Sequence, residues 1–473
     1  MRRLRRGYSS KGRARRSQCR GWGFDSPYLH QELYFDHLNR HIIPQPYTSL
    51  MGVILYNIPH FAALRHKDYA YTWGASGMAG ASSWTFLIAS QWFVLDLSDQ
   101  SSLVGWFTFA SMIPFLVASP IGGLLADRVE RKKLTIITQI LGIATIGCAA
   151  ILSLAAVLEL WHLCILAFIA GSCRTTQEAS IVSLITNLVP RDDLLNAITL
   201  NSATRHGSRV IGMSILIISG VSQSINFGTS EFLLGSMLFG IASAILMLKV
   251  KQTSTGETGG TTNPFRGIWE GMNYIYAHRV VAIFIILVAF HCALAMSFDS
   301  ILPGFTKERL SSINETILAL LVVSFGIGSA GGTFLLAGVR NEKRKGLLLL
   351  SMGISSGISP LILGFSFNVS TAFFATLLMG ATESIFMALT ATYVQLVTPD
   401  RLRGRVTSLY ILHAGGIMAF ANLGYGYLAD LYNASNVLIV TGAIFFIFFA
   451  GISFSDPILK SVYKGTNVPE LTD

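Results

Sequence analysis

The chain has 473 residues, of which 52% are hydrophobic and 13% are charged. This composition is too apolar for an ordinary soluble globular protein, so it excludes that class and indicates a protein that crosses a membrane many times. The net charge of +10 is spread over an N-terminal tail and the loops between apolar segments, so it does not indicate a nucleic-acid-binding surface.

Residues 1–60 form a basic N-terminal extension that carries nine Lys and Arg before residue 21. One interpretation is a targeting segment or a tail that binds anionic lipids. The other starts from Gly23-Phe-Asp-Ser-Pro27, because the TψC arm of a transfer-RNA gene gives this sequence when it is translated in one frame. We prefer the second interpretation, which predicts that Met51 is the true start of the protein.

Apolar segments recur from Tyr71 to Ser455, each about 20 residues or longer, the length of a helix that crosses a bilayer core. We predict an all-α membrane protein with twelve spans, at 71–95, 103–126, 134–158, 161–187, 196–221, 231–249, 280–303, 315–338, 346–365, 371–397, 406–430 and 436–455. From these spans we predict two six-helix halves, an N-terminal one at 61–249 and a C-terminal one at 280–457. A linker at 250–279, with an amphipathic helix around Trp269, joins them, and a C-terminal tail occupies 458–473.

The basic residues outside these spans fall mainly on one side of the membrane. That side holds Arg128, Arg131, Lys132, Lys133, Arg191, Lys249, Lys251, Arg266, Arg279, Arg340, Lys343, Arg344, Lys345, Arg401, Arg403 and Arg405. The opposite loops hold Lys307 and Arg309. Because Lys and Arg accumulate in cytoplasmic loops, we expect a multi-pass protein of the cell membrane with both termini in the cytoplasm.

The two predicted halves resemble each other at an offset of 209 residues. This shift carries Gly171 onto Gly380 and Pro190 onto Pro399, so that each pair brackets a span and its exit. Two homologous halves that face each other are typical of carriers that alternate between two open states.

The run from Gly122 to Lys133 places one acid and then a cluster of bases in a short loop between two spans. We predict a cytoplasmic gate, because charges and helix-end dipoles of one half can meet span ends of the other. The offset places Arg131 on Arg340, so the loop after Arg340 is interpreted as a second copy that has lost its acid. The predicted gating residues are Gly123, Asp127, Arg128, Arg131 and Lys132.

With these motifs the chain resembles the major facilitator superfamily over about 61–457, and more narrowly the bacterial group of the enterobactin exporter and related drug exporters. The other motifs that carry the resemblance are Leu188-Val-Pro-Arg-Asp-Asp-Leu-Leu-Asn-Ala197, Arg209-Val-Ile-Gly212, Glu270-Gly-Met-Asn-Tyr274 and Leu402-Arg-Gly-Arg-Val406. The resemblance implies a secondary transporter without a cofactor, driven by the proton gradient. We expect it to work as a monomer in the lipid bilayer on a small-molecule substrate.

Three positions depart from the family pattern. The gating motif usually has glycine where Glu130 stands, and the motif of span five usually has proline where Met213 stands. Relatives often carry an acid near Ser83. Its absence here moves any proton-coupling role to another residue and weakens the prediction of export.

Five charged residues lie deep in the interior of predicted spans: Arg174, Glu178, Arg205, Arg209 and Glu383. A charge at the bilayer centre costs roughly 2.5–3.5 kcal/mol on insertion scales, so each needs a partner or a water-filled cavity. Arg174 and Glu178 are four residues apart, and an ion pair that only holds the helix in the bundle is the plainer interpretation. Glu383 has no Lys or Arg within one turn of its own helix, so it is our preferred proton-coupling residue, with Glu178 and Arg174 as further candidates.

The substrate cavity is predicted to be lined by charged, aromatic and amide side chains: Arg174, Arg205, Arg209, Trp84, Gln91, Tyr393 and Asn422. Three cations against two acids favour an amphipathic, anionic substrate such as a siderophore. Broad drug export, import or uniport by the same fold, and a transport-inactive sensor or scaffold are the alternatives. Asp299 is expected to lie at the membrane surface. The sequence has no catalytic motif for an enzyme and no metal-type spacing of its cysteines.

Overall fold

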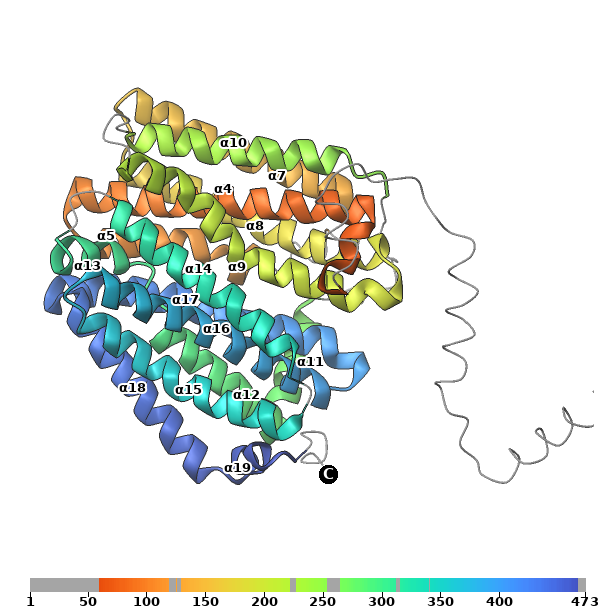
Figure 1. Ribbon diagram of the computed structural model, residues 1–473. Helices are drawn as coiled ribbons and strands as arrows, with labels where there is room; N and C mark the ends of the chain where they lie inside the picture. The colour runs from red at the N-terminus through yellow and green to blue at the C-terminus, as the bar shows by residue number, and fades with distance from the viewer. Residues whose placement is uncertain are drawn as a thin grey trace, which may run out of the picture. The chain divides into compact units, whose positions relative to one another are not determined.

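The computed structural model describes residues 59–118, 125, 129–221, 227–252, 264–311, 315–339 and 341–466. These residues form helices and connecting turns, and no β-strand occurs among them. They belong to one compact unit that runs from Ile58 to Asp473 (Figure 1). The proposed start at Met51 and the basic extension before it lie outside the described residues.

A first group of helices is formed by the chain up to residue 248. Its elements are η1 (Pro59–Arg65), α4 (Lys67–Ser98), α5 (Ser101–Met112), α7 (Arg131–Leu154), α8 (Leu160–Leu188), α9 (Arg191–Val221) and α10 (Thr229–Leu248). In this group α4 packs against α9 and α10, while α7 packs against α8 and α10. The long helices run side by side along a common direction (Figure 1).

A second group follows residue 263. Its elements are α11 (Pro264–Ala277), α12 (Arg279–Phe290), η2 (His291–Ala295), α13 (Leu302–Arg309), α14 (Thr316–Ala337), α15 (Glu342–Gly364), α16 (Val369–Val397), α17 (Asp400–Tyr432), α18 (Ala434–Ser455) and α19 (Pro457–Lys464). Here α14 and α15 pack against α16, and α15 also packs against α18. A core of aromatic rings, Phe386, Phe445 and Phe449, joins these helices.

The main contacts between the two groups are those of α5 with α17 and of α9 with α14, and α4 also contacts α13. At the start of α5, the Asp430 carboxylate of α17 accepts hydrogen bonds from the backbone N–H of Ser101 at 2.6 Å and of Ser102 at 3.0 Å. A carboxylate at this position satisfies free helix N–H groups and opposes the positive end of the helix dipole. Nearby, the Lys307 ammonium lies 2.9 Å from the Asp99 carboxylate.

Close helix packing depends on glycine at repeat-related positions. A Cβ atom added to Gly380 of α16 would lie 2.0 Å from the carbonyl oxygen of Phe325 in α14. One added to Gly171 of α8 would lie 2.4 Å from the carbonyl oxygen of Ser111 in α5. Membrane helices approach each other this closely only where a small residue leaves room for the backbone.

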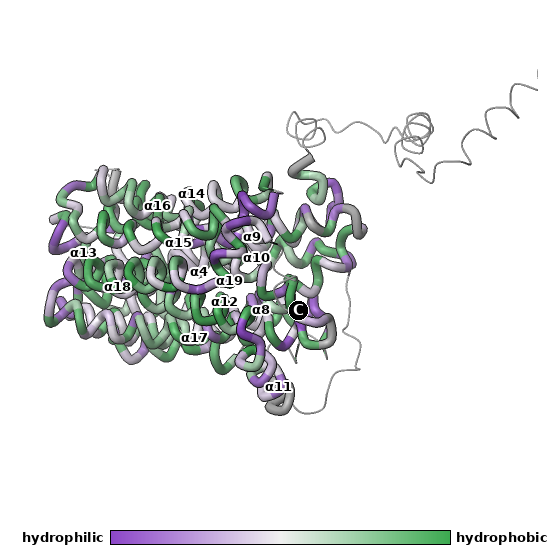
Figure 2. The backbone as a smooth tube through the Cα atoms, turned by 90° about the horizontal axis from the view of Figure 1, so that it is seen from below, coloured by the Kyte–Doolittle hydropathy of each residue, from purple (hydrophilic) through white to green (hydrophobic). Residues whose placement is uncertain are grey.

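Eight of the described helices are long and apolar enough to cross a membrane, or nine if the bent pair of helices at 269–277 and 279–295 forms one span. Helices α4, α8 and α9 have 32, 29 and 31 residues, so they also have the length for a span, but they are more polar. Figure 2 shows hydrophilic segments near α13 and near α11, at opposite ends, and mostly hydrophobic segments between them. The chain is therefore an all-helical, multi-pass membrane protein.

The predicted span at 280–303 is wrong in its last turns. The helix ends in the π-helical turn η2, and the chain is not helical again until α13, which has Pro303 in its first turn. The Ser297 hydroxyl donates to the carbonyl oxygen of Cys292 at 2.7 Å, which supports this break. Asp299, in this break, is buried among the helices, with 6% of its surface exposed, and its place at the membrane surface stays a prediction.

Candidate functional site

Arg209 of α9 is held between two aromatic rings from different helices. Its guanidinium carbon lies 3.8 Å from the ring centre of Trp84 in α4 and 4.2 Å from that of Phe325 in α14. The residue is 8% exposed, and its Nε atom has no hydrogen-bond partner among the described residues. A flat guanidinium suits stacking on both rings, which a lysine ammonium would not reproduce.

Two acids act on the charge of Arg209, namely Glu383 of α16 and Asp299 of the turn after η2. Glu383 is partly exposed, and its Oε2 atom accepts a long hydrogen bond from the Ser329 hydroxyl at 3.4 Å. Ser329 also donates to the carbonyl oxygen of Gly380 at 3.0 Å, so the hydroxyl is shared between two acceptors. We call Arg209, Asp299 and Glu383 the Arg209 cluster.

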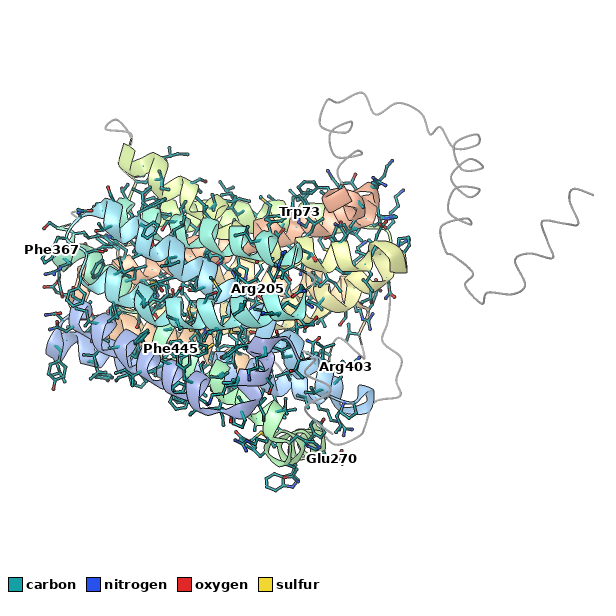
Figure 3. All side chains as sticks on the ribbon, turned by 60° about the horizontal axis from the view of Figure 1, so that its bottom comes forward. Trp73, Arg205, Glu270, Phe367, Arg403 and Phe445 are labelled. Carbon is teal, nitrogen blue, oxygen red and sulfur yellow. The ribbon has the colours of Figure 1, made fainter. Side chains whose placement is uncertain are left out.

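A second set of charges, the Glu178 cluster, consists of Arg174, Glu178 and Arg205. The Nε atom of Arg174 lies 3.2 Å from one oxygen of Glu178, and a terminal nitrogen of Arg205 lies 3.8 Å from the other. These side chains are 30%, 35% and 59% exposed, in the order Arg174, Glu178, Arg205. The intrahelical pair predicted from the spacing is present, and α9 adds a second cation; Figure 3 shows Arg205 near the middle of the helices.

The Trp84 ring connects the two clusters. The Arg174 guanidinium carbon lies 5.7 Å from its centre, and that of Arg209 lies 3.8 Å from it. Together the clusters hold three bases and three acids, because the buried Asp299 adds a carboxylate that the sequence pattern had placed elsewhere. The net positive charge from which we predicted an anionic substrate is therefore absent among these six residues.

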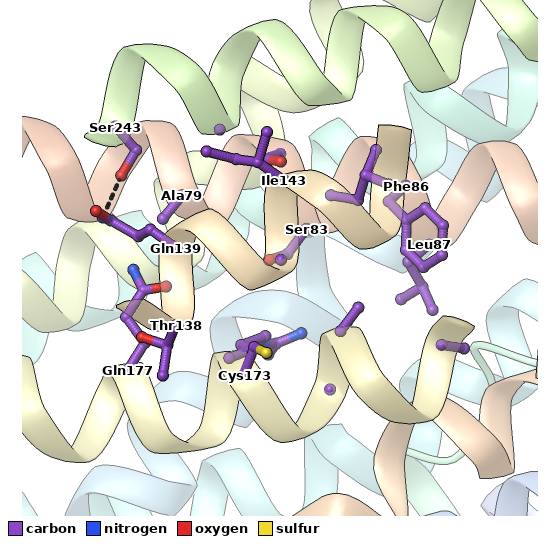
Figure 4. Close-up of a pocket in the computed structure, with 18 of the residues that line it drawn as sticks. Ala79, Ser83, Phe86, Leu87, Thr138, Gln139, Ile143, Cys173, Gln177 and Ser243 are labelled. Carbon is purple, nitrogen blue, oxygen red and sulfur yellow. Dashed lines mark hydrogen bonds between the residues drawn. The ribbon is translucent and has the colours of Figure 1, made fainter. Parts of the chain in front are cut away.

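A cavity of about 100 Å³ adjoins the Glu178 cluster. Its lining includes Trp84, Arg174, Glu178, Asn201 and Arg205. A second cavity, of about 70 Å³, extends among α4, α5, α7, α8 and α10 (Figure 4). The two share Ala79, Ser83, Arg174 and Gln177.

Three of the predicted cavity residues, Gln91, Tyr393 and Asn422, line neither of these cavities. All three are at most 1% exposed. The amide nitrogen of Gln91 donates to the Thr108 hydroxyl at 2.9 Å, and the amide oxygen of Asn422 accepts from the backbone N–H of Ser300 at 3.0 Å. In this conformation they pack between helices. A polar residue inside a span can hydrogen-bond to a neighbouring helix as well as line a cavity, so its type alone does not distinguish the two roles.

The predicted gate is described in part. Gly123, Asp127, Arg128 and the second-copy residue Arg340 lie outside the described residues. Arg131, at the start of α7, donates from its guanidinium to the carbonyl oxygen of Ser183 in α8 at 3.0 Å. Lys132 is partly exposed on the same helix end.

The sequence analysis did not identify three residues around Arg209 and Glu383, namely Asp299, Phe325 and Ser329. An acid in an apolar segment, such as Asp299, is in itself a sign of a functional residue. Its burial, however, depends on the helix break, which the sequence analysis did not predict. Phe325 and Ser329 belong to the glycine-rich stretch of α14, where nothing in the sequence separates them from packing residues.

Comparison with known proteins places these features in context. The sequence profile described as transmembrane secretion effector matches residues 58–464. Macrolide efflux protein A of Streptococcus pyogenes is 21% identical over 356 residues, which cover 74% of this chain and 85% of the relative. The staphyloferrin A transporter of Staphylococcus aureus is 23% identical over 352 residues, covering 73% and 86%. The multidrug efflux pump Tap of Mycolicibacterium fortuitum is 21% identical over 339 residues, covering 70% and 81%.

Solved structures of similar fold include the nucleoside transporter NupG, with a TM-score of 0.62 and 12% identity over 84% of this chain and 100% of that one. A POT family transporter in complex with 5-aminolevulinic acid has a TM-score of 0.64 and 12% identity, covering 82% and 96%. At this identity the likeness concerns the fold alone.

Proposed function

Because the chain belongs to the transmembrane secretion effector family of the major facilitator superfamily, we propose that it exports a small amphipathic molecule in exchange for protons. It is a membrane transporter, and the relatives reported above are named for macrolide efflux, multidrug efflux and staphyloferrin A transport. The observation that carries the proposal is the Arg209 cluster, in which one buried base interacts electrostatically with two acids from other segments.

The architecture that we propose has twelve spans in two six-helix halves. The halves are α4 to α10 and α12 to α18, with α11 as a surface helix between them. Support comes from the 209-residue repeat, from the close contacts at Gly171 and Gly380, and from packing that is denser within each group than between groups. The distribution of Lys and Arg supports cytoplasmic termini.

Proton exchange follows from the charge of the Arg209 cluster. With both acids ionised the cluster has a net charge of −1, and binding of one proton makes it neutral. Because unbalanced charge inside a membrane is costly, protonation favours the conformation in which the cluster is closed off from water. Glu383 is the proposed proton site, since it is partly exposed whereas Asp299 is buried.

Substrate binding is linked to this cluster through Trp84. A substrate beside Arg174 and Glu178 would shift the Trp84 ring on which Arg209 also stacks. Movement of Arg209 changes the field at Glu383 and therefore its affinity for a proton. Such reciprocal linkage between two sites is the thermodynamic requirement of an exchanger.

We further infer that this conformation opens toward the cytoplasm. Three polar contacts between the two groups lie where α5 begins and α17 ends: Asp430 with the α5 backbone, Lys307 with Asp99, and Trp106 with Tyr427 at 2.8 Å. These ends face outward in the proposed topology. Outward opening has to separate these contacts, which are thus the outer closure.

The balance of three bases and three acids favours a substrate with polar groups of either sign over a strict anion. A siderophore-like metabolite and a drug-like amphiphile both satisfy it. Broad-specificity drug export is the second candidate, favoured by the relatives named for macrolide and multidrug efflux. Import or uniport by the same fold would leave the Arg209 cluster without the proposed coupling role.

The test uses the full chain in proteoliposomes with an imposed pH gradient, and it measures gradient-driven movement of the macrolide erythromycin and of staphyloferrin A. In Glu383→Gln, the acceleration of substrate movement by the pH gradient should be at least tenfold smaller than in the wild type. Substrate exchange at equal pH on both sides should persist. The matched control is Glu342→Gln, at an acid paired with Lys345 at the start of α15. Unchanged coupling in Glu383→Gln removes this residue from the mechanism, and movement of neither probe by the wild type contradicts export.

A further inference from the structure

The second cavity, which we call the side cavity, is built entirely by helices of the first group. Its volume of about 70 Å³ is several times the ~10–15 Å³ that one water requires. Figure 4 shows Gln139, Gln177, Thr138 and Ser243 toward one end and the apolar side chains of Phe86 and Leu87 toward the other. The cavity therefore has a polar end and a hydrocarbon end.

Gln139 of α7 lines this cavity and carries an amide oxygen, Oε1, without a hydrogen-bond partner among the described residues. The residue is 4% exposed. The Ser243 hydroxyl donates its proton to the carbonyl oxygen of Ala75 at 2.7 Å, so it can only accept from Gln139, at 2.7 Å. This fixes the amide with its nitrogen toward Ser243 and leaves the oxygen as a free acceptor.

A buried acceptor without a donor is costly, so a donor brought by a ligand would be favoured there. The side cavity also adjoins the cavity of the Glu178 cluster, since Ser83, Arg174 and Gln177 line both. Arg174, at this shared boundary, is the charged residue in its lining. A charged group deeper inside would lack a counter-ion.

We propose that the side cavity is a subsite that binds an uncharged arm of the transported molecule. The arm has an apolar body, which lies against Phe86 and Leu87, and a hydroxyl or amide group that donates to Gln139 Oε1. The charged or strongly polar part of the molecule stays beside Arg174 and Glu178. This inference rests on the proposed export function and names the substrate class: an amphiphile with a hydroxyl-bearing side arm, such as a glycosylated lactone.

Gly142 makes the subsite testable. It lines the cavity, and a Cβ atom added to it would meet no atom within 4 Å, so Gly142→Leu fills the space without a backbone clash. Gly451 of α18 is the matched control, because it has the same free space and is exposed on a different helix. Gln139→Leu removes the acceptor with little change of volume, and it serves if Gly142→Leu does not fold.

The experiment measures binding of radiolabelled erythromycin to the purified full chain, together with labelling of Cys173 by N-ethylmaleimide. Cys173 lines the side cavity, and the other four of the five cysteines are replaced by alanine for the labelling. Bound erythromycin should slow labelling of Cys173 at least fivefold. Gly142→Leu should weaken binding at least tenfold and Gln139→Leu roughly 2- to 12-fold, the loss of one hydrogen bond, while Gly451→Leu binds normally.

Absence of saturable binding, absence of protection at Cys173, or normal binding by both cavity variants would overturn the subsite. Movement of erythromycin is measured in parallel in proteoliposomes. Binding with protection but without gradient-driven movement contradicts the export function and leaves the subsite standing. Movement with unprotected Cys173 and unaffected cavity variants contradicts the subsite alone.

Discussion

The Arg209 cluster and the Glu178 cluster contain the same kinds of charge but differ in how they are assembled. Glu178 is paired by Arg174 one turn away on its own helix, and the three side chains of its cluster remain 30–59% exposed. Arg209 is 8% exposed, stacks between rings of two other helices, and interacts electrostatically with acids from two further segments. Water screens the charges of the Glu178 cluster, so their electrostatic interactions are weak. Burial makes the interactions of Arg209 stronger, so the loss of any residue of the Arg209 cluster has a larger effect.

The largest expected effect comes from Arg209→Met. It leaves Asp299 and Glu383 without their cation, and loss of one partner from a buried set of charges typically costs about 3–5 kcal/mol. We expect a clear fall in melting temperature in detergent and loss of gradient-driven transport. Arg174→Met is the matched control in the exposed cluster, and equal destabilisation by both variants would erase the distinction between the clusters.

An intermediate effect is expected from Asp299→Asn. The Arg209 cluster then starts neutral, and proton uptake makes it positive instead of neutral, so protonation becomes less favourable. Gradient-driven efflux of erythromycin should fall severalfold while its equilibrium binding stays within about twofold, since the Glu178 cluster is intact. Transport with wild-type gradient dependence would exclude Asp299 from the cluster's function.

The smallest effect is expected from Glu178→Gln. Exposed ion pairs contribute about 0–1 kcal/mol, so the melting temperature should change little. Substrate binding should change a few-fold, because the cavity beside Arg174 and Arg205 loses its acid, and the dependence on the pH gradient should persist. Loss of that dependence would move the coupling role from Glu383 to Glu178.

The sequence predicted local features of the site well. The i, i+4 spacing of Arg174 and Glu178 sets their pairing on one helical face, and the 209-residue repeat identified the glycines at 171 and 380 that the backbone contacts require. It could not show how a side chain is surrounded by residues of other helices. Gln91 and Asn422 are packing residues in this conformation, although their type and depth resemble those of cavity residues.

The sequence by itself determined the class of this protein: apolar length and composition require membrane helices, since a backbone in lipid must satisfy its own hydrogen bonds. Hydropathy and the repeat also set the order of the helices. The tertiary structure decided which charges meet. The break after η2 places Asp299 inside the bundle, where the neighbouring Ser300 N–H donates to Asn422. The approach of α4, α9 and α14 places Arg209 between two rings. These contacts join residues more than 100 positions apart, which no local pattern encodes.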